Sequence, residues 1–363
     1  MLGACHSAPP ASFPAPSTPA RDSTPRRPFY RPLPYGSESQ FSPLSVVLND
    51  AFGQLRTSPR TDITRYPFGA SFKAVARSVI QPDRSIRNYG YGQWLRNEIF
   101  PLSLKANGGG QWYPNYTLHL FGGGVTYMKL VDWFADHGVE SHPRIAAGLM
   151  TYAYHFVNEA IENGPTADKG VDALSDLLVF DSGAMILWNA TSFPELFGRR
   201  VETNVWYGQA SVGIPGRTIE NSSSLVMVRT AIPRTDDWRL MVTHGLALTV
   251  GVSRRVGSDG WLTLGSGADA RATPVIDTVT GKKTASLAPN LALFYDRNGS
   301  LLASLITRGG SNNGLTLNVY PGPIHIGRIR PSLWVQQNKG GGVRFGLSSQ
   351  LGIGVSTFAG IRH

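Results

Sequence analysis

A run of alternating residues in the second half of the chain constrains the fold more than any other feature. Between positions 238 and 252 the even-numbered residues are Trp, Leu, Val or His, whereas the odd-numbered residues from 243 onward are Thr, Gly and Ala. A period of two predicts a β-strand with one apolar face and one face of small or polar residues. The same alternation returns at 343–347 and 351–355. Two architectures fit this pattern: a membrane barrel with apolar side chains outward, or a soluble barrel with apolar side chains inward.

The composition favours the membrane barrel. Charged residues make up 16% of the chain, compared with about 25% in ordinary soluble domains. The chain also contains 41 glycines among its 363 residues, which is above average usage. Transmembrane barrels have this profile, because apolar residues alternate with small polar residues along each of their strands.

Residues 201–363 are therefore predicted to form an antiparallel β-barrel of about ten strands. Turn signals separate most of the alternating segments, for example Ser258-Asp259-Gly260 and Pro321-Gly322-Pro323. The expected strands lie near residues 203–214, 222–232, 237–253, 260–272, 284–296, 300–308, 314–320, 326–337, 341–349 and 351–361.

The preceding segment, residues 41–200, is predicted to be a helical module, so the expected fold class is α+β. Residues 82–114 are rich in Gly and Pro and are predicted to be a loop. No helical stretch is apolar over the length that a membrane-spanning helix needs. The expected helices cover residues 45–55, 68–79, 116–137, 143–163 and 171–188.

Residues 1–40 are predicted to be a disordered, proline-rich leader or tether. Cys5 is the only cysteine, and with Leu2-Gly3-Ala4 before it the sequence resembles the lipobox of bacterial lipoproteins. This resemblance implies that Cys5 is the lipidation site. Only four residues precede Cys5, whereas a secretion signal is much longer. Either translation starts upstream of Met1, or the match is accidental.

The net charge of +10 bears on the partners of the chain. Several basic residues lie at expected turns of the barrel, such as Arg254, Arg255, Lys282 and Lys283. A nucleic-acid site would need basic residues gathered on one face with aromatic residues or a known module, so no nucleic-acid partner is predicted. Membrane lipid is the expected partner through anionic headgroups, and solvated turns are the alternative use of these charges. We expect a monomer without a cofactor.

The helical segment contains one recognisable set of motifs. Asn115-Tyr116-x-x-His119 precedes three glycines, 122–124, and a later helical stretch contains Ser175-Asp176-Leu177 followed by Gly183-Ala184. Together with the glutamates near residue 160, this set resembles a family of bacterial envelope proteins in which such a helical module adjoins an outer-membrane β-barrel. The resemblance implies a location and an architecture rather than a reaction. The three glycines indicate close helix packing, because no strand precedes them and no Lys-Ser/Thr pair follows as in a phosphate loop.

The same segment contains the candidate functional residues. His155, Glu159 and Glu162 occupy positions i, i+4 and i+7, which places them on one face of a helix. His119 from the preceding helix and Asp176 from the following helix can converge on that face. The favoured interpretation is a buried hydrogen-bond network that fixes how three helices pack. A divalent metal site, a general acid–base site and a solvated surface are the alternatives. The candidate site residues are His119, His155, Glu159 and Asp176.

The sequence therefore predicts a protein of the bacterial outer membrane with a structural or lipid-interacting role. The alternative is a membrane-bound envelope enzyme, a hydrolase or transferase of lipid or cell wall, that uses the His/Glu/Asp cluster. The two hypotheses differ in what they require around the cluster. An enzyme needs a cleft beside it, whereas a packing network should be dry and fully hydrogen-bonded.

Overall fold

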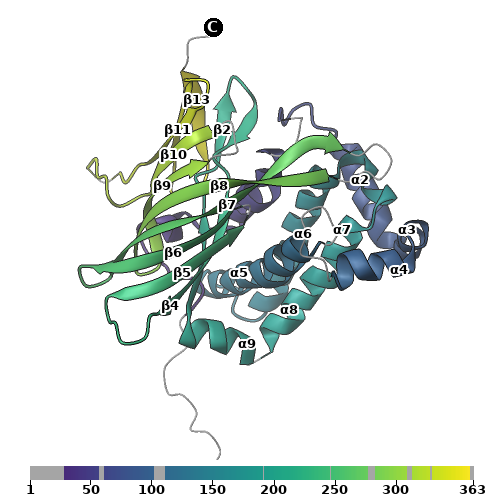
Figure 1. Cartoon of the computed structure of the whole chain (residues 1–363), viewed down its shortest axis with the longest axis horizontal. Coiled ribbons are helices and arrows are strands. Elements are labelled where there is room, and N and C mark those ends of the chain that lie inside the picture. The colour runs from purple at the N-terminus through teal and green to yellow at the C-terminus, as the bar shows by residue number, and fades with distance from the viewer. Residues whose placement is uncertain are drawn as a thin grey trace, which may run out of the picture.

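The computed structural model of the chain describes residues 28–56, 61–101, 111–190, 192–245, 247–276, 283–308, 313–327 and 329–359. Cys5 and residues 1–27 of the predicted leader lie outside this part. The described residues confirm an α+β fold, in which a helical module precedes a large and mainly antiparallel sheet. Figure 1 shows the two parts beside each other, with helices α2 to α9 on one side of strands β4 to β8.

The helical module contains regular α-helices and several 3-10 and π-helical turns. The helix predicted at 143–163 is confirmed as α6, and those predicted at 68–79, 116–137 and 171–188 are also present. The elements are η1 (Ser37–Gln40), α1 (Pro43–Val46), η2 (Val47–Ala51), η3 (Phe52–Arg56), α2 (Phe68–Ile80), α3 (Pro82–Tyr89), α4 (Tyr91–Trp94), η4 (Leu95–Ile99), η5 (Tyr113–Gly123), α5 (Gly124–Asp136), α6 (Pro143–Asn163), η6 (Gly164–Lys169), α7 (Asp172–Ser175), η7 (Asp176–Asp181), α8 (Ser182–Asn189), α9 (Ser192–Glu195) and η8 (Leu196–Arg200).

The prediction of a loop over residues 82–114 is wrong for its first part, where α3, α4 and η4 lie. Pro82 is the first residue of α3, and Gly90 ends that helix with a φ of 98°. Proline at the first helical position loses no intrahelical hydrogen bond, and glycine readily adopts the positive φ that ends a helix. The residues that indicated a loop therefore mark the two ends of a short helix.

Residues 28–40, which the sequence assigned to the disordered leader, are packed in the structure. Phe29 and Tyr30 are buried in the main hydrophobic core, and η1 follows them. The Phe29 ring meets the Trp188 ring edge-on at 5.7 Å. The aromatic residues explain the difference, because burying each of them outweighs the extended preference of the neighbouring prolines.

The sheet contains thirteen strands in the described residues, where the sequence predicted about ten. Two divisions and one additional strand account for the difference: the segments predicted at 203–214 and 237–253 each correspond to two strands, and β3 was not predicted. The strands are β1 (Glu202–Tyr207), β2 (Ser211–Ile214), β3 (Thr218–Glu220), β4 (Ser224–Ala231), β5 (Trp238–Gly245), β6 (Ala247–Val256), β7 (Gly260–Ile276), β8 (Lys283–Arg297), β9 (Ser300–Arg308), β10 (Asn313–Val319), β11 (Ser332–Asn338), β12 (Val343–Ser348) and β13 (Gly354–Ala359).

The hairpin of β5 and β6 explains why one long strand was predicted there. Leu240 pairs with Val252, and Val242 pairs with Val250. Even-numbered residues of both strands thus lie opposite each other on the same face of the sheet. The alternation therefore continues through the turn without interruption and does not reveal it.

Neighbouring strands pair in the order β1-β4-β5-β6-β7-β8-β9-β10-β11-β12-β13-β2-β3. This order has two ends, so the pairing is that of an open sheet, and the closed barrel of about ten strands is not shown. The register is nevertheless continuous from β1 to β2 and from β3 to β4. Glu202 pairs with Arg229, and Ser211 pairs with Glu220, so the same number of residues separates the two pairs on each side of the hairpin. The segments β1/β2 and β3/β4 thus form one interrupted hairpin, and β13 pairs with β2 in parallel.

The sheet is strongly curved, because residues far apart in the strand order meet across its concave side. The guanidinium of Arg229 on β4 contacts Asp296 on β8, which is the fourth strand away. Asn221, just before β4, donates a hydrogen bond to Asn318 Oδ1 on β10 at 2.7 Å. Trp334 on β11 donates to Ser211 Oγ on β2 at 2.9 Å.

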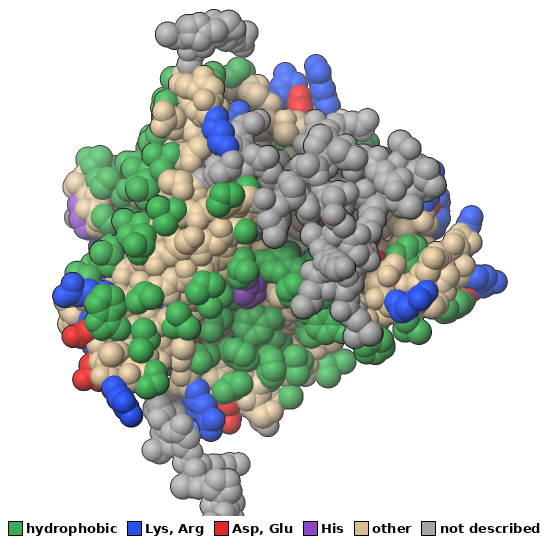
Figure 2. Space-filling view, viewed as in Figure 1, with side chains coloured by type: hydrophobic (Ala, Val, Ile, Leu, Met, Phe, Trp, Pro, Cys, Tyr) green, Lys and Arg blue, Asp and Glu red, His purple; other side chains and the backbone are tan. Residues whose placement is uncertain are grey.

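The two faces of the sheet differ in character. The concave face carries buried polar side chains, including Ser253 and Thr263, whose hydroxyl oxygens lie 2.7 Å apart, together with a buried apolar cluster that includes Met227 and Phe294. The convex face carries a row of apolar residues that are paired directly from strand to strand across β5 to β12. All are exposed except Val335, which is half-buried, and Figure 2 shows hydrophobic side chains over much of this surface. The row is Leu240, Val252, Leu264, Leu293, Leu305, Leu317, Val335 and Phe345.

The helical module packs directly against the sheet, because Val205 and Tyr207 of β1 and Val226 of β4 belong to its main hydrophobic core. Hydrogen bonds also join the two parts. The Tyr113 hydroxyl of η5 donates to the Gly245 carbonyl at the end of β5, at 2.9 Å, and Gln40 of η1 donates to Ser332 Oγ at the start of β11, at 2.9 Å. Among the described residues, no helix combines the length and the apolar character needed to cross a membrane.

Candidate functional site

The structure brings the four candidate residues together in the interior of the helical module. His119 is on η5, His155 and Glu159 are on α6, and Asp176 is the first residue of η7. All four are buried. His119 Nε2 lies 3.5 Å from Asp176 Oδ2, and the His119 and His155 ring centroids are 4.8 Å apart. The predicted convergence of three helical segments on one face of α6 is thus present in the structure.

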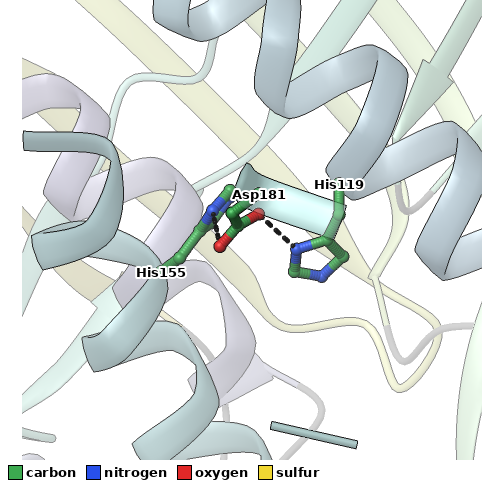
Figure 3. Close-up of side chains that lie close together, drawn as sticks. All are labelled: His119, His155 and Asp181. Carbon is green, nitrogen blue, oxygen red and sulfur yellow. Dashed lines mark hydrogen bonds and ion pairs between the residues drawn. The ribbon is translucent and has the colours of Figure 1, made fainter. Parts of the chain in front are cut away.

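A fifth residue, Asp181, lies between the two imidazoles and was not predicted. Its Oδ1 is 3.1 Å from His119 Nδ1 in a hydrogen bond. Its Oδ2 is 2.7 Å from His155 Nδ1, an ion-pair contact whose angles are outside those of a hydrogen bond. Figure 3 shows the carboxylate of Asp181 between the two rings. This carboxylate orients both histidines.

Two π-helical segments place these side chains. His119 lies within η5, and Asp176 and Asp181 are the two ends of η7. In an α-helix, residues five apart point about 140° away from each other. The wider turn of a π-helix brings residues i and i+5 closer to the same side. Both aspartates therefore reach the histidines, and wide turns of this kind often occur at functional sites.

Burial and mutual repulsion raise the pKa values of two carboxyl groups in the cluster. The pKa of Glu159 is well above its usual value because of burial and of the nearby charges of Asp176 and Asp172. The pKa of Asp176 is raised by burial and by the charges of Asp172 and Asp181. Burial would lower the pKa of His119, but its hydrogen bond to Asp181 and the surrounding carboxylates raise it to about 9. The cluster thus contains more acidic groups than its two imidazoles can neutralise.

Polar residues around the cluster hold some of its carboxylates. Asn163 donates to Glu159 Oε2 at 2.9 Å and to Asp172 Oδ2 at 3.0 Å. Asn115, the first residue of the Asn-Tyr-x-x-His motif, donates to the Glu98 carbonyl at 3.1 Å and to Glu98 Oε2 at 3.4 Å. The motif therefore links η5 to η4, and the role of Glu98 was not visible in the sequence.

Glu98 should make stability depend on pH. Burial and the charge of Asp172 raise its pKa to about 8, and Asp176 and Tyr89 also face it. The folded protein then keeps a proton that the unfolded chain releases above about pH 4.5, so stability should fall as the pH rises toward 8. We expect a loss on the order of 3 kcal/mol.

Glu98→Gln tests this expectation, because glutamine keeps the bond to Asn115 without a titratable proton. Urea unfolding in detergent at pH 5 and at pH 8 is the measurement. The variant should match the wild type at pH 5 and exceed its stability at pH 8. Equal pH slopes for the two proteins would contradict the assignment.

The three glycines 122–124 have the packing role that the sequence predicted. A Cβ on Gly124 would lie 2.0 Å from the Trp188 ring. A Cβ on Gly123 would lie 3.1 Å from His155 Cε1, and one on Gly122 would lie 3.4 Å from Val226 on β4. The glycines thus allow η5 and α5 to approach both the cluster and the sheet.

An apolar groove lies on the other side of η5, between that helix and strands β5 and β6. Trp112, Tyr113, Tyr116, Thr117, Phe121, Val242, His244 and Leu248 line it. None of the four candidate residues is among these lining residues. The groove therefore does not supply the cleft beside the cluster that the enzyme hypothesis requires.

No family model, curated protein or solved structure matches the chain. The resemblance to an envelope family thus rests on the sequence motifs alone. Two groups in the described residues have the composition and spacing of a metal site. They are His119 with His155 and Asp181, and His119 with Glu159 and Asp176.

Proposed function

We propose that the chain is a β-barrel protein of the bacterial outer membrane, with a structural or lipid-interacting role. In this proposal the sheet of residues 201–363 is embedded in the bilayer, and the helical module is attached to it outside the hydrocarbon region. The expected partner is membrane lipid. Lipidation of Cys5 would add a second anchor to the same membrane.

The observation that carries the proposal is the polarity of the two faces of the sheet. A soluble sheet buries its apolar face, but here the apolar row from Leu240 to Phe345 lies on the convex, exposed face. Leu264, near the middle of the row, is 59% exposed. The concave face buries hydroxyl, amide and charged side chains beside a smaller apolar cluster. Lipid outside and polar groups inside is the arrangement of transmembrane barrels.

The strand register supports closure into a barrel. Because β1 and β2 are two parts of one strand, that strand has β3/β4 on one side and β13 on the other. β2 therefore pairs on both sides, and closure along the remaining edges of β1 and β3 would avoid exposed edge hydrogen-bonding groups, which a bilayer does not tolerate. The contacts of Arg229 with Asp296 and of Asn221 with Asn318 across the concave side are those expected inside a narrow barrel.

Fractionation is the first test. We expect the full chain expressed in a Gram-negative bacterium to appear in the outer-membrane fraction and to need detergent for extraction. A difference in mobility between heated and unheated samples on a detergent gel would indicate a folded barrel. Recovery of the intact chain as a soluble monomer without detergent would contradict the proposal.

Leu264→Arg tests the lipid-facing surface directly. Leu264 pairs with Leu293 on one side and with Val252 on the other, so arginine would lie in the middle of the apolar row. If this row is near the bilayer midplane, the substitution should reduce the free energy of folding into lipid vesicles by about 2 to 4 kcal/mol.

Leu351→Arg is the matched control. Leu351 is even more exposed, at 70%, but it lies in the turn between β12 and β13 rather than in the row. Its cost should be about 0 to 1 kcal/mol, as at a membrane interface. Equal costs for the two variants would show that the row does not face lipid.

A further inference from the structure

The helical cluster has one set of ligand atoms with no counterpart in the proposed membrane role. One ligand atom each from His119, Glu159 and Asp176 lie within 4.8 Å of one another. Atoms bound to one first-row metal ion at about 2.0 to 2.2 Å are about 3 to 4 Å apart. The 3.5 Å between His119 Nε2 and Asp176 Oδ2 already falls in this range. Small side-chain rotations would bring the third ligand to the same distance.

Two oxygen atoms in this set have no hydrogen-bond partner among the described residues. They are Oε1 of Glu159 and Oδ1 of Asp176, and both residues are more than nine-tenths buried. No lysine or arginine in the described part of the chain forms an ion pair with either carboxylate. A packing network should leave no such atoms, because an unpaired buried carboxylate oxygen is costly. The hydrogen-bond network that the sequence favoured thus leaves these two acceptor atoms open to a further ligand.

We propose that His119, Glu159 and Asp176 bind one divalent transition-metal ion, with Asp181 orienting the histidine ligand. The hydrogen bond between His119 Nδ1 and Asp181 Oδ1 turns Nε2 toward Asp176, so Nε2 is the nitrogen that would give up its proton and bind the metal. A carboxylate behind a metal-binding histidine is the usual arrangement in metalloproteins. His155 lies on the far side of Asp181 and is assigned a supporting role.

The ligand set indicates which ions would bind. One imidazole and two carboxylates, without a thiolate, suit Zn²⁺, Mn²⁺ or Fe²⁺. They suit Ca²⁺ and Mg²⁺ less well, because these ions prefer ligands that are all oxygen. Three protein ligands also leave at least one coordination position for a further ligand. The proposal is thus for a borderline first-row ion with an open position, buried inside the helical module.

The local electrostatics favour a dication at this point. The buried Glu159 and Asp176 gather in one place with the neighbouring Asp172, which accepts a hydrogen bond from the same Asn163 that donates to Glu159. A divalent ion would offset the repulsion between these carboxylates.

The test is a metal titration of the full chain in detergent. The protein is stripped with a chelator, and Zn²⁺ or Mn²⁺ is then added alone at pH 7 while binding is followed by calorimetry and elemental analysis. We expect one ion per chain in the wild type. Glu159→Gln and Asp176→Asn should each weaken binding by more than 100-fold, and Asp181→Asn should weaken it by about 10- to 100-fold.

Glu162→Gln is the control, because Glu162 lies on the same helix but accepts a hydrogen bond from Gln54 instead of joining the ligand set. It should bind metal within a few-fold of the wild type. Substitution with Co²⁺ gives a second measurement that needs only the wild type, so a variant that fails to fold does not prevent the test. The absorption spectrum of the bound Co²⁺ should indicate nitrogen and oxygen ligands and should contain no thiolate band. Absence of a stoichiometric ion, or wild-type affinity in Glu159→Gln and Asp176→Asn, would overturn the proposal.

Discussion

Arg229→Met should lower the free energy of unfolding by about 3 to 5 kcal/mol. Arg229 is fully buried on the concave side of the sheet and forms two bidentate pairs. It donates to both carboxylate oxygens of Glu202, at 3.1 and 3.0 Å, and to both of Asp296, at 2.7 and 2.8 Å. Methionine has a similar length but no charge, so two buried carboxylates would lose the partner that compensates for their desolvation.

Arg239→Met is the matched control for this prediction. Arg239 lies near the same glutamate, 3.9 Å from Glu202 Oε2, but its side chain is partly exposed. Its loss should cost less than about 1 kcal/mol, which is typical of exposed pairs. Urea unfolding in detergent gives both values. Similar small costs for the two variants would mean that water reaches the concave side and solvates the carboxylates there.

The alternation of polarity along each strand could be predicted from the sequence, but the pairing and the edges of the sheet could not. Alternation requires only that neighbouring residues point to opposite faces, so the apolar row was visible in one strand at a time. Whether that face was buried or exposed depended on the curvature of the whole sheet. The curvature appears only in contacts between distant strands, such as that of Arg229 with Asp296. The hairpin at β5 and β6 was hidden because its register preserves the alternation.

The candidate site was predicted in part for a related reason. His155 and Glu159 are one α-helical turn apart, so ordinary periodicity placed them on one face. Asp181 is five residues after Asp176, and α-helical periodicity directs the two residues to different sides. The π-helical turn of η7 changes that relation. No residue pattern in 176–181 predicts the wider turn, so the residue that orients both histidines could not be found from the sequence.

Lys129→Met should destabilise the protein by about 3 to 5 kcal/mol, for the same physical reason at a different place. Lys129 on α5 is fully buried and forms an ion pair with Glu38 of η1. Its ammonium group also donates to Asn204 Oδ1 at 2.8 Å and to the Val205 carbonyl on β1 at 2.9 Å. This single cation joins the N-terminal segment, a helix and the sheet. Methionine would leave Glu38 buried without its cation.

Two comparisons separate this role from a general effect of losing a lysine. Lys73→Met removes an exposed lysine from α2 and should change stability by less than about 0.5 kcal/mol. Adding Glu38→Gln to Lys129→Met should recover part of the lost stability, because glutamine leaves no unpaired buried charge and can still accept a hydrogen bond from Asn204. Urea unfolding of the three variants in detergent measures each term. If the double variant is no more stable than Lys129→Met, the cost comes from lost packing around the lysine stem. Recovery would instead show that the buried charge of Glu38, left without its cation from α5, sets the cost.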